Sequence, residues 1–119
     1  MSAQRARGTK FETAVVRFLQ DGGLWASRKP LTVPDAGDVN VGPDVATLQL
    51  KAYRDLTAAL REGVEGATIQ ASVAGTRWSA AVLKRANKST AEAYVAMPLS
   101  QYREILWLLV QHDKQESME

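Results

Sequence analysis

The sequence contains no cysteine, which excludes disulfide bonds, thiolate zinc sites and cysteine nucleophiles. Its only histidine, His112, lies near the C-terminus, so we expect neither multi-histidine metal binding nor serine–histidine catalysis. No apolar run approaches the length of a membrane span, and the first residues lack the apolar core of a signal peptide. We therefore expect a cytoplasmic protein that makes no membrane contact.

The composition is that of an ordinary globular protein. The chain has 119 residues, of which 45% are hydrophobic and 24% charged. This length supports one hydrophobic core, so we predict a single domain over residues 1–119. The last residues, 113–119, are expected to form a flexible acidic tail.

Positive charge is unevenly distributed, although the net charge is only +2. One cluster precedes every acidic residue of the chain: Arg5, Arg7 and Lys10. A second cluster lies in a stretch without any acid: Arg77, Lys84, Arg85 and Lys88. Such clusters suit a phosphate backbone. The alternative is a solvated strand edge, where Lys and Arg discourage aggregation.

Residue periodicity predicts an alternation of helices and strands. Apolar spacing predicts helices over 9–20 and 55–74 and a last helix from Ser100. Gly63 and Gly66 each cost about 1 kcal/mol within a helix, so a break there is one alternative. Strands are predicted over 24–31, 37–41, 46–52, 78–85 and 92–97. The order α-β-β-β-α-β-β-α indicates an α/β domain with a mixed five-stranded sheet flanked by helices.

The strand containing Asp38 and the strand that follows it can form a hairpin in two registers. A three-residue loop would pair Asp38 with Leu48 and mix polar with apolar side chains on both faces. A four-residue loop pairs Asp38 with Gln49 and separates the two kinds of side chain. We predict the second register, which places Asp38, Gln49 and Lys51 on one polar surface.

Glu12 lies on or beside the apolar stripe of the first predicted helix. A carboxylate that points inward needs a partner, because burying a bare charge is costly. A metal ion or Lys51 would supply that partner. In the alternative, Glu12 points to solvent or pairs with Lys10 or Arg17. The corresponding alternative for Asp38 and Lys51 is a half-exposed hairpin with a polar outer face.

Three motifs in this order resemble the PD-(D/E)xK nuclease superfamily and, within it, the archaeal-type Holliday junction resolvases and their phage relatives. The motifs are Arg7-Gly8-Thr9-Lys10-Phe11-Glu12, Gly37-Asp38-Val39 and Leu48-Gln49-Leu50-Lys51. They cover roughly residues 5–60, and the remainder of the chain agrees only in its order of elements. The resemblance implies a restriction-endonuclease-like domain. In two departures, Gly37 replaces the family's proline and Gln49 replaces its more usual acid.

The resemblance also implies a catalytic set. Glu12, Asp38, Gln49 and Lys51 match the family's catalytic positions. Asp38, Gln49 and the Leu50 carbonyl would bind Mg²⁺ directly, with Mn²⁺ as a substitute, and Glu12 would bind it directly or through water. Lys51 would position the attacking water and offset negative charge at the phosphate.

The function implied is that of a metal-dependent endodeoxyribonuclease which cuts near four-way DNA junctions, in recombination and repair. One alternative is a broader nuclease for forks and flaps. Another is a non-catalytic DNA-binding module in which Gln49 marks a decayed site. Retention of Glu12, Asp38 and Lys51 argues against decay.

Two cuts in one junction call for a homodimer with two-fold symmetry. We expect its interface to include the helix over 100–112, which is apolar nearly all round between Ile105 and Val110. The alternative is a helix wedged inside the core of the monomer. Phosphate contacts near the cleft are assigned to Arg5, Arg7, Lys10, Arg28 and Lys29. A second DNA arm is assigned to Arg77, Lys84, Arg85 and Lys88, whereas Tyr53 is expected to be a core or sheet residue.

Overall fold

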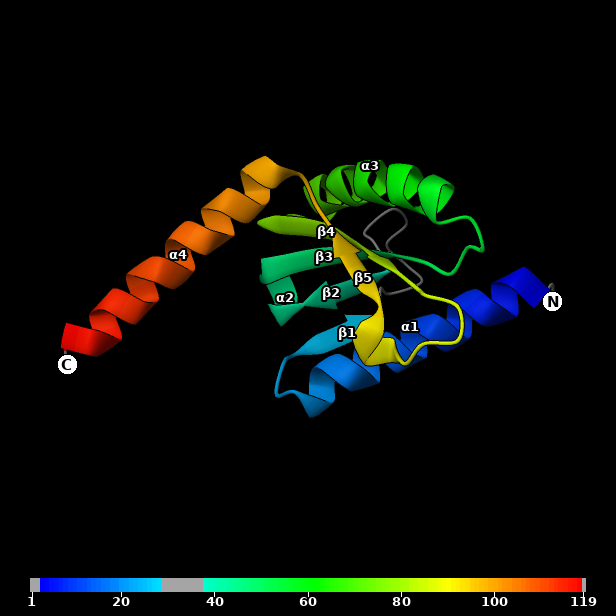
Figure 1. Ribbon diagram of the computed structural model, residues 1–119, viewed down its shortest axis with the longest axis horizontal. Coiled ribbons are helices and arrows are strands. Elements are labelled where there is room, and N and C mark those ends of the chain that lie inside the picture. Colours follow the sequence, from blue (N-terminus) through cyan, green and yellow to red (C-terminus); the bar gives the residue numbers. More distant parts are fainter. Residues whose placement is uncertain (1–2, 29–37, 119) are drawn as a thin grey trace.

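The computed structural model describes residues 3–28 and 38–118, with side chains from Gly8 onward. The helices and strands follow the predicted order, with two short helical turns added (Figure 1). They are α1 (Ala3–Asp21), β1 (Ala26–Arg28), β2 (Val39–Val41), α2 (Gly42–Val45), β3 (Ala46–Lys51), α3 (Leu56–Ala74), β4 (Trp78–Leu83), η1 (Thr90–Glu92), β5 (Tyr94–Ala96) and α4 (Leu99–Met118). The predicted α/β class is therefore confirmed.

The predicted mixed sheet is confirmed as well. Within the described ranges it has five strands in the order β1-β2-β3-β4-β5. Only β3 and β4 run parallel, and the other neighbours are antiparallel. The helix α3 connects the parallel pair, because parallel strands need a long crossover.

The register of β2 against β3 is the predicted one. Val39 pairs with Leu48 and Asn40 with Thr47, which leaves four residues, those of α2, as the connection. Thr47 donates a hydrogen bond to Asn40 across the pair (3.2 Å). The segregation of polar from apolar side chains thus selected the correct hairpin.

Helices α1 and α3 cover opposite faces of the sheet (Figure 1). On one face, Phe11 and Val15 of α1 are buried against Val39, Leu50 and Val82. These apolar side chains form the larger part of the core, and their burial is the main favourable term in folding. The α1 face of the sheet is therefore the apolar face.

The opposite face packs closely against α3, whose fully buried residues are all small. The buried positions of α3 recur every four residues: Ala59, Gly63, Ala67 and Ala71. A Cβ atom on Gly63 would lie 2.8 Å from Cβ of Ala81, too close for any real contact. Gly63 thus serves close approach. The helix is unbroken through Gly63 and Gly66, so the alternative of a break is excluded.

Some predicted boundaries differ from the structure. The strand expected over 24–31 is shown only as β1, and its last three positions, 29–31, lie outside the described residues. The strand expected from Glu92 begins at Tyr94 instead. Glu92 closes the turn η1, where its carboxylate accepts hydrogen bonds from the N–H and hydroxyl of Ser89 (both 3.1 Å). This capping box holds the segment in a helical turn.

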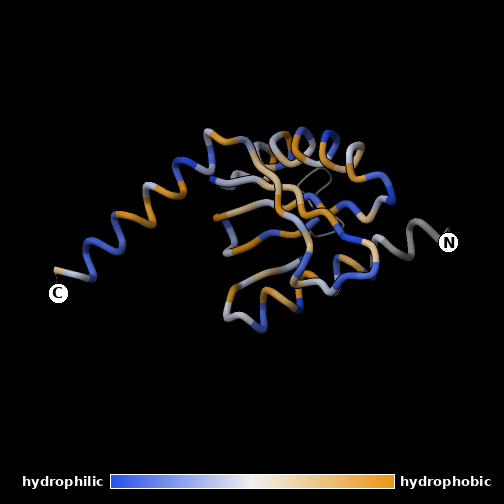
Figure 2. The backbone as a smooth tube through the Cα atoms, in the orientation of Figure 1, coloured by the Kyte–Doolittle hydropathy of each residue, from blue (hydrophilic) through white to orange (hydrophobic). Residues whose placement is uncertain are grey.

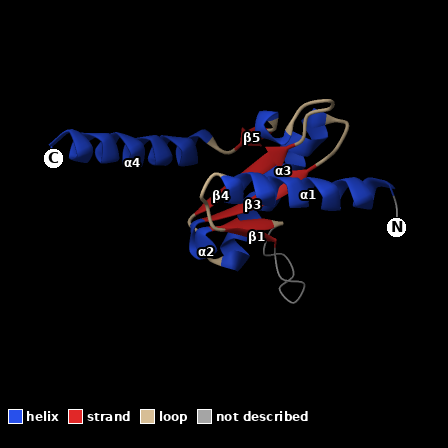
Figure 3. Ribbon diagram, turned by 90° about the horizontal axis from the view of Figure 1, so that it is seen from below, coloured by secondary structure: helices blue, strands red, loops and turns tan. Residues whose placement is uncertain are grey.

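The last helix, α4, projects from the body of the protein (Figures 1 and 3). It begins at Leu99 rather than at the predicted Ser100, because the Pro98 carbonyl accepts hydrogen bonds from the Gln101 and Tyr102 N–H groups. None of its described residues is buried, which excludes the alternative of a helix wedged in the core.

The helix α4 includes most of the segment expected to be a flexible tail, since it continues as far as Met118. In the described ranges, no helix is long and apolar enough to cross a membrane.

Candidate functional site

Strand directions bring several predicted site residues to one edge of the sheet. Asp38 lies immediately before β2, Lys51 ends β3, and Lys84 follows β4. Because β2 is antiparallel to β3 and β3 is parallel to β4, all three lie where β3 and β4 end. Arg28, which pairs with Val39, ends β1 at the same place. We call this place the carboxyl edge.

Asp38 is held at the carboxyl edge by the backbone of β3. Its N–H donates to the Leu48 carbonyl (3.1 Å), and its Oδ2 accepts a hydrogen bond from the Leu50 N–H (2.8 Å). The second bond leaves Oδ1 without a hydrogen-bond donor among the described residues. The N–H and C=O of one residue in an extended strand point to the same side, so the Leu50 carbonyl also faces the β2 side of β3.

Gln49 is the most unusual residue of the predicted site. Its side chain is 9% exposed and lies under α3, where a Cβ atom on Gly66 would meet its Cγ at 3.8 Å. Its Oε1 atom is buried and has no hydrogen-bond partner within the described part of the chain. A buried polar atom without a partner is costly, and native proteins normally satisfy it. This amide oxygen therefore calls for a partner that the described residues do not supply.

Lys51 lies on the same face of β3 as Gln49. A Cβ atom on Gly63 would meet Cγ of Lys51 at 3.4 Å, so α3 covers the lysine side chain near its base. The ammonium group donates a hydrogen bond to the Tyr53 hydroxyl (3.3 Å) and lies 5.1 Å from the centre of the ring. Tyr53 thus contributes a polar contact to the site through its hydroxyl, although the sequence suggested a core or sheet residue. The only feature of the sequence that could have indicated this contact is that Tyr53 lies two residues after Lys51.

Glu12 approaches the carboxyl edge from α1, on the opposite face of the sheet. Its Oε2 atom forms an ion pair with Arg28 (2.9 Å), and its side chain is 24% exposed. The expected partners were a metal ion, Lys51, Lys10 or Arg17, and the pair with Arg28 was not foreseen. The structure therefore places Gln49 and Lys51 on one face of β3, binds the Asp38 carboxylate to the Leu50 backbone between them, and adds Glu12 at the same edge from α1.

The oxygen atoms available at the carboxyl edge fit a hard divalent cation. They are a carboxylate oxygen of Asp38, the unpartnered amide oxygen of Gln49 and the backbone carbonyl of Leu50. Mg²⁺ prefers oxygen ligands and is often held by one or two carboxylates, with water completing its shell. The neutral Gln49 supplies an oxygen but no charge, so Asp38 would carry the nearest negative charge.

A second cluster of possible metal ligands lies far from this edge, on α4. His112, Asp113 and Glu116 are all exposed. His112 approaches Glu116 at 3.6 Å, one helical turn away. Exposed acidic groups are common without a metal, so this cluster does not support a magnesium site.

The cations predicted to bind DNA are placed in different parts of the molecule. Arg77 precedes β4 and Lys84 follows it, so the two lie at opposite ends of that strand. Arg77 forms an ion pair with Glu104 (3.3 Å) and stacks on Trp78 (4.5 Å). The expected second arm of Arg77, Lys84, Arg85 and Lys88 is therefore not one continuous patch.

The remaining predicted cations differ in how firmly they are held. Arg85 stacks on the Tyr94 ring (4.3 Å), whereas Lys88 and Lys10 are exposed. Arg28 is engaged by Glu12. The side chains of Arg5 and Arg7, and the whole of Lys29, lie outside the described residues.

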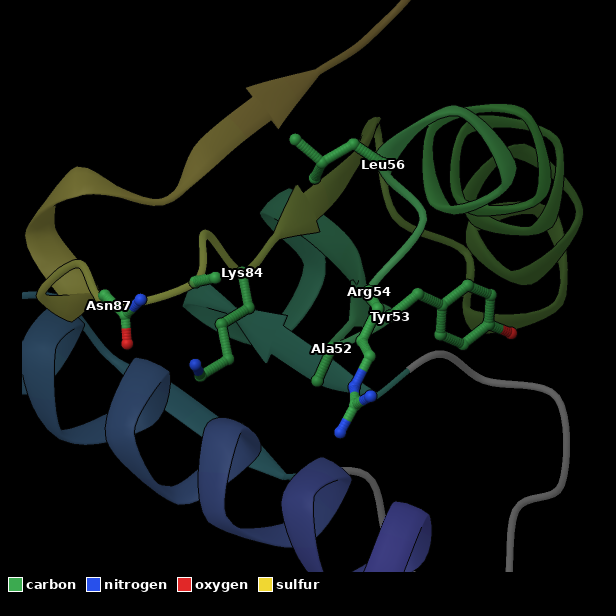
Figure 4. A pocket seen from close by; sticks show the side chains of 7 residues that line it. Ala52, Tyr53, Arg54, Leu56, Lys84 and Asn87 are labelled. Atoms are coloured by element: carbon green, nitrogen blue, oxygen red, sulfur yellow. The ribbon is translucent and has the colours of Figure 1, made fainter.

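A groove of about 530 Å³ opens at the carboxyl edge between the segments that follow β3 and β4 (Figure 4). Among the described residues that line it, Lys84 is the only one predicted to bind DNA. Arg54 and Asn87 also line it and were missed, because both follow strands in loops where no periodic pattern marks them. We call it the Lys84 groove.

Comparison with known proteins does not extend this picture: no family model matches the chain, and searches of curated proteins and of solved structures find no significant similarity. The functional argument consequently depends on the residues gathered at the carboxyl edge.

Proposed function

We propose that the chain is a metal-dependent endodeoxyribonuclease with a restriction-endonuclease-like domain, and that its substrate is a four-way DNA junction. One observation carries this proposal. The buried Oε1 of Gln49, without a partner in the described residues, lies on the strand face that ends in Lys51, one residue before Leu50, whose N–H donates to the Asp38 carboxylate. A cation bound here would give this amide oxygen a partner.

Each residue would have a distinct task. Asp38, Gln49 and the Leu50 carbonyl would hold Mg²⁺, or Mn²⁺ in its place. When bound, the ion would lower the pKa of a water molecule and stabilise negative charge on the phosphate. Lys51 would orient the attacking water, and its hydrogen bond to Tyr53 restricts where the ammonium group can lie. In-line attack would break the bond to the leaving 3′-oxygen and leave a 5′-phosphate.

Glu12 would support this site by positioning Arg28. The guanidinium is paired with the Glu12 carboxylate at the carboxyl edge and remains partly exposed. Arginine binds phosphate oxygens readily, so a DNA strand at this edge could take Arg28 from Glu12. Glu12 itself would bind the metal directly or through water.

The proposed active form is a homodimer, because symmetric resolution of a four-way junction requires two sites. The projecting helix α4 supports this, since it exposes Leu106, Trp107, Leu109 and Val110. Figure 2 shows hydrophobic residues recurring along the helix where it leaves the body. A second copy of the chain would bury these side chains.

The proposal is tested by cleavage of a labelled four-way junction alongside linear duplex, fork and flap DNA, with Mg²⁺ or with EDTA. Wild type, Asp38→Asn and Lys51→Ala would be compared. We expect paired symmetric cuts in the junction that need Mg²⁺ and are lost in Asp38→Asn. Lys51→Ala should bind the junction with wild-type affinity and cleave it at least about 100-fold more slowly, the scale of losing one charge-stabilising group.

The other outcomes assign other functions. Equal cleavage of forks and flaps would indicate a broader branched-DNA nuclease. Tight junction binding with no cleavage by the wild type in Mg²⁺ or Mn²⁺ would indicate a DNA-binding module with a decayed site. Wild-type cleavage by Lys51→Ala would remove that residue from the mechanism.

A further inference from the structure

We infer that the Lys84 groove binds a backbone phosphate of the DNA strand next to the phosphate that is cut. This inference rests on the proposed function for the identity of the neighbouring site, but phosphate binding in the groove can be measured without cleavage. The groove is lined by residues from three segments: the loop after β3, the start of α3 and the loop after β4 (Figure 4).

The charge of the groove selects an anion. Its lining includes Arg54 and Lys84 and, among the described residues, no acid. Figure 4 shows both side chains extending from the ends of β3 and β4 toward α1. Neither forms an ion pair within 4.0 Å with a described residue, in contrast to Arg28 and Arg77. Both charges are thus available to a ligand.

The acid nearest in sequence does not neutralise these charges. Asp55 follows Arg54, but its carboxylate caps α3 and accepts hydrogen bonds from the N–H groups of Thr57 (2.9 Å) and Ala58 (3.3 Å). An N-cap carboxylate is stabilised by the unpaired N–H groups of the helix and stays there. The cap therefore keeps the groove cationic.

The donors in the groove suit phosphate oxygens. A guanidinium can donate two parallel hydrogen bonds to a phosphate, and an ammonium group acts as a compact charge. Asn87 adds a side-chain amide at the rim, from a turn where its φ is 59°. Asparagine tolerates this left-handed conformation better than most residues. The turn is closed by a hydrogen bond from the Lys88 N–H to the Arg85 carbonyl (3.3 Å).

The groove is connected to the catalytic set by the backbone. The Lys84 N–H donates to the Lys51 carbonyl (3.0 Å), so the residue that ends β3 is hydrogen-bonded to the residue that follows β4. Neighbouring strands lie about 4.8 Å apart. Side chains alternate faces, and Lys51 shares its face with Leu83, so Lys84 points to the other face. A DNA strand that crosses the carboxyl edge would meet Lys51 and then the groove.

The test measures junction binding in the Asp38→Asn background with EDTA, so that neither metal nor cleavage contributes. Fluorescence anisotropy over a salt series would compare Lys84→Gln and Arg54→Gln with two variants that remove the same charge from α4, Lys114→Gln and Arg103→Gln. We expect each groove variant to weaken binding and to reduce the slope of log affinity against log salt by about 1. The α4 controls should leave the slope unchanged.

A second series locates the phosphate. Junctions would carry one neutral methylphosphonate at a time along the strand. At one position, next to the cut, we expect the methylphosphonate to weaken junction binding by the parent protein. The same methylphosphonate should have little further effect on junction binding by Lys84→Gln. Slopes equal to those of the α4 controls, or effects that add at every position, would overturn the inference even if Mg²⁺-dependent cleavage is found. If cleavage is absent but the groove variants still reduce the salt slope, phosphate binding in the groove is supported and the nuclease proposal fails.

Discussion

At the scale of single residues, Gln49 combines two properties that seldom occur together. It is almost fully buried, and its amide oxygen has no partner within the described part of the chain. Gln70 of α3 shares both features to a lesser degree, since it is half-buried and its Oε1 is also without a partner there. Gln49, unlike Gln70, lies on the strand that ends in Lys51 at the carboxyl edge. Comparing the same substitution at Gln49 and at Gln70 therefore separates metal binding from the cost of burying a charge.

The first prediction concerns Gln49→Glu. Without metal, the new carboxylate would be buried under α3 without a partner, so we expect a loss of at least about 1 kcal/mol in the free energy of unfolding. With Mg²⁺, both carboxylates would ligate the ion, and the rise in Tm should exceed that of the wild type while cleavage is retained. Thermal unfolding with and without Mg²⁺ measures both effects.

Gln70→Glu is the matched control, because it places a charge on α3 at another buried amide oxygen that has no partner in the described residues and is not a proposed ligand. It should lower Tm equally with and without Mg²⁺. A Gln49→Glu protein whose Tm is indifferent to Mg²⁺, and which no longer cleaves, would show that Gln49 is not a ligand.

The side-chain contacts of single residues were harder to predict from the sequence than the face of the strand on which each residue lies. Alternation along a strand places Gln49 and Lys51 together, because it depends only on the backbone. The ion pair of Glu12 with Arg28 and the bond from Lys51 to Tyr53 depend on how α1 and the loop after β3 pack. Such contacts follow from tertiary structure, so short-range patterns did not predict them.

At the scale of elements, the decisive feature is the close approach of α3 to the sheet. Its two internal glycines look alike in the sequence, since each costs helix stability. The structure distinguishes them. A Cβ atom on Gly63 would collide with Ala81, whereas one on Gly66 would make ordinary contacts with Gln49 at 3.8 and 3.9 Å.

The second prediction is that alanine has opposite effects at these two positions. Gly66→Ala should raise the free energy of unfolding by about 0.5–1 kcal/mol, because alanine is the better helix former. Gly63→Ala should lower it by about 1–3 kcal/mol, because α3 must move off the sheet. Urea unfolding monitored by circular dichroism gives both values. Equal stabilisation by both variants would contradict the packing of α3.

At the scale of the whole molecule, α4 gives the protein its elongated form, 55 Å in its longest dimension. Its first turn is anchored to β4, because Gln101 accepts a hydrogen bond from the Ser79 N–H (3.0 Å) and donates one to the Ser79 carbonyl (2.6 Å). Beyond this anchor the helix leaves the body and exposes its apolar side chains. A helix with such a surface is expected to find a partner.

The third prediction is that α4 forms the dimer interface. Leu106→Glu combined with Leu109→Glu should convert a dimer into a monomer, because the charges would be buried at the interface. Folding should be nearly unaffected, since both side chains are exposed in the monomer (42% and 57%). Multi-angle light scattering over a range of concentrations measures the change.

The control for this prediction substitutes two exposed apolar residues of α3, Ile69→Glu and Val73→Glu. Their side chains are 65% and 55% exposed. This variant should remain dimeric. Dissociation of the α3 variant instead would place the interface on that helix, and a monomeric wild type would remove the dimer from the proposed function.

The sequence alone determined the order of elements, the α/β class and the hairpin register, because periodicity and the separation of polar from apolar side chains are local properties. It also placed Gln49 and Lys51 on one face of β3, because side chains alternate along a strand. Only the tertiary structure decided that Arg28 holds Glu12, that Arg77 and Lys84 lie apart, and that Arg54 and Lys84 share a groove. These relations join residues distant in the chain, and strand direction and helix packing set them.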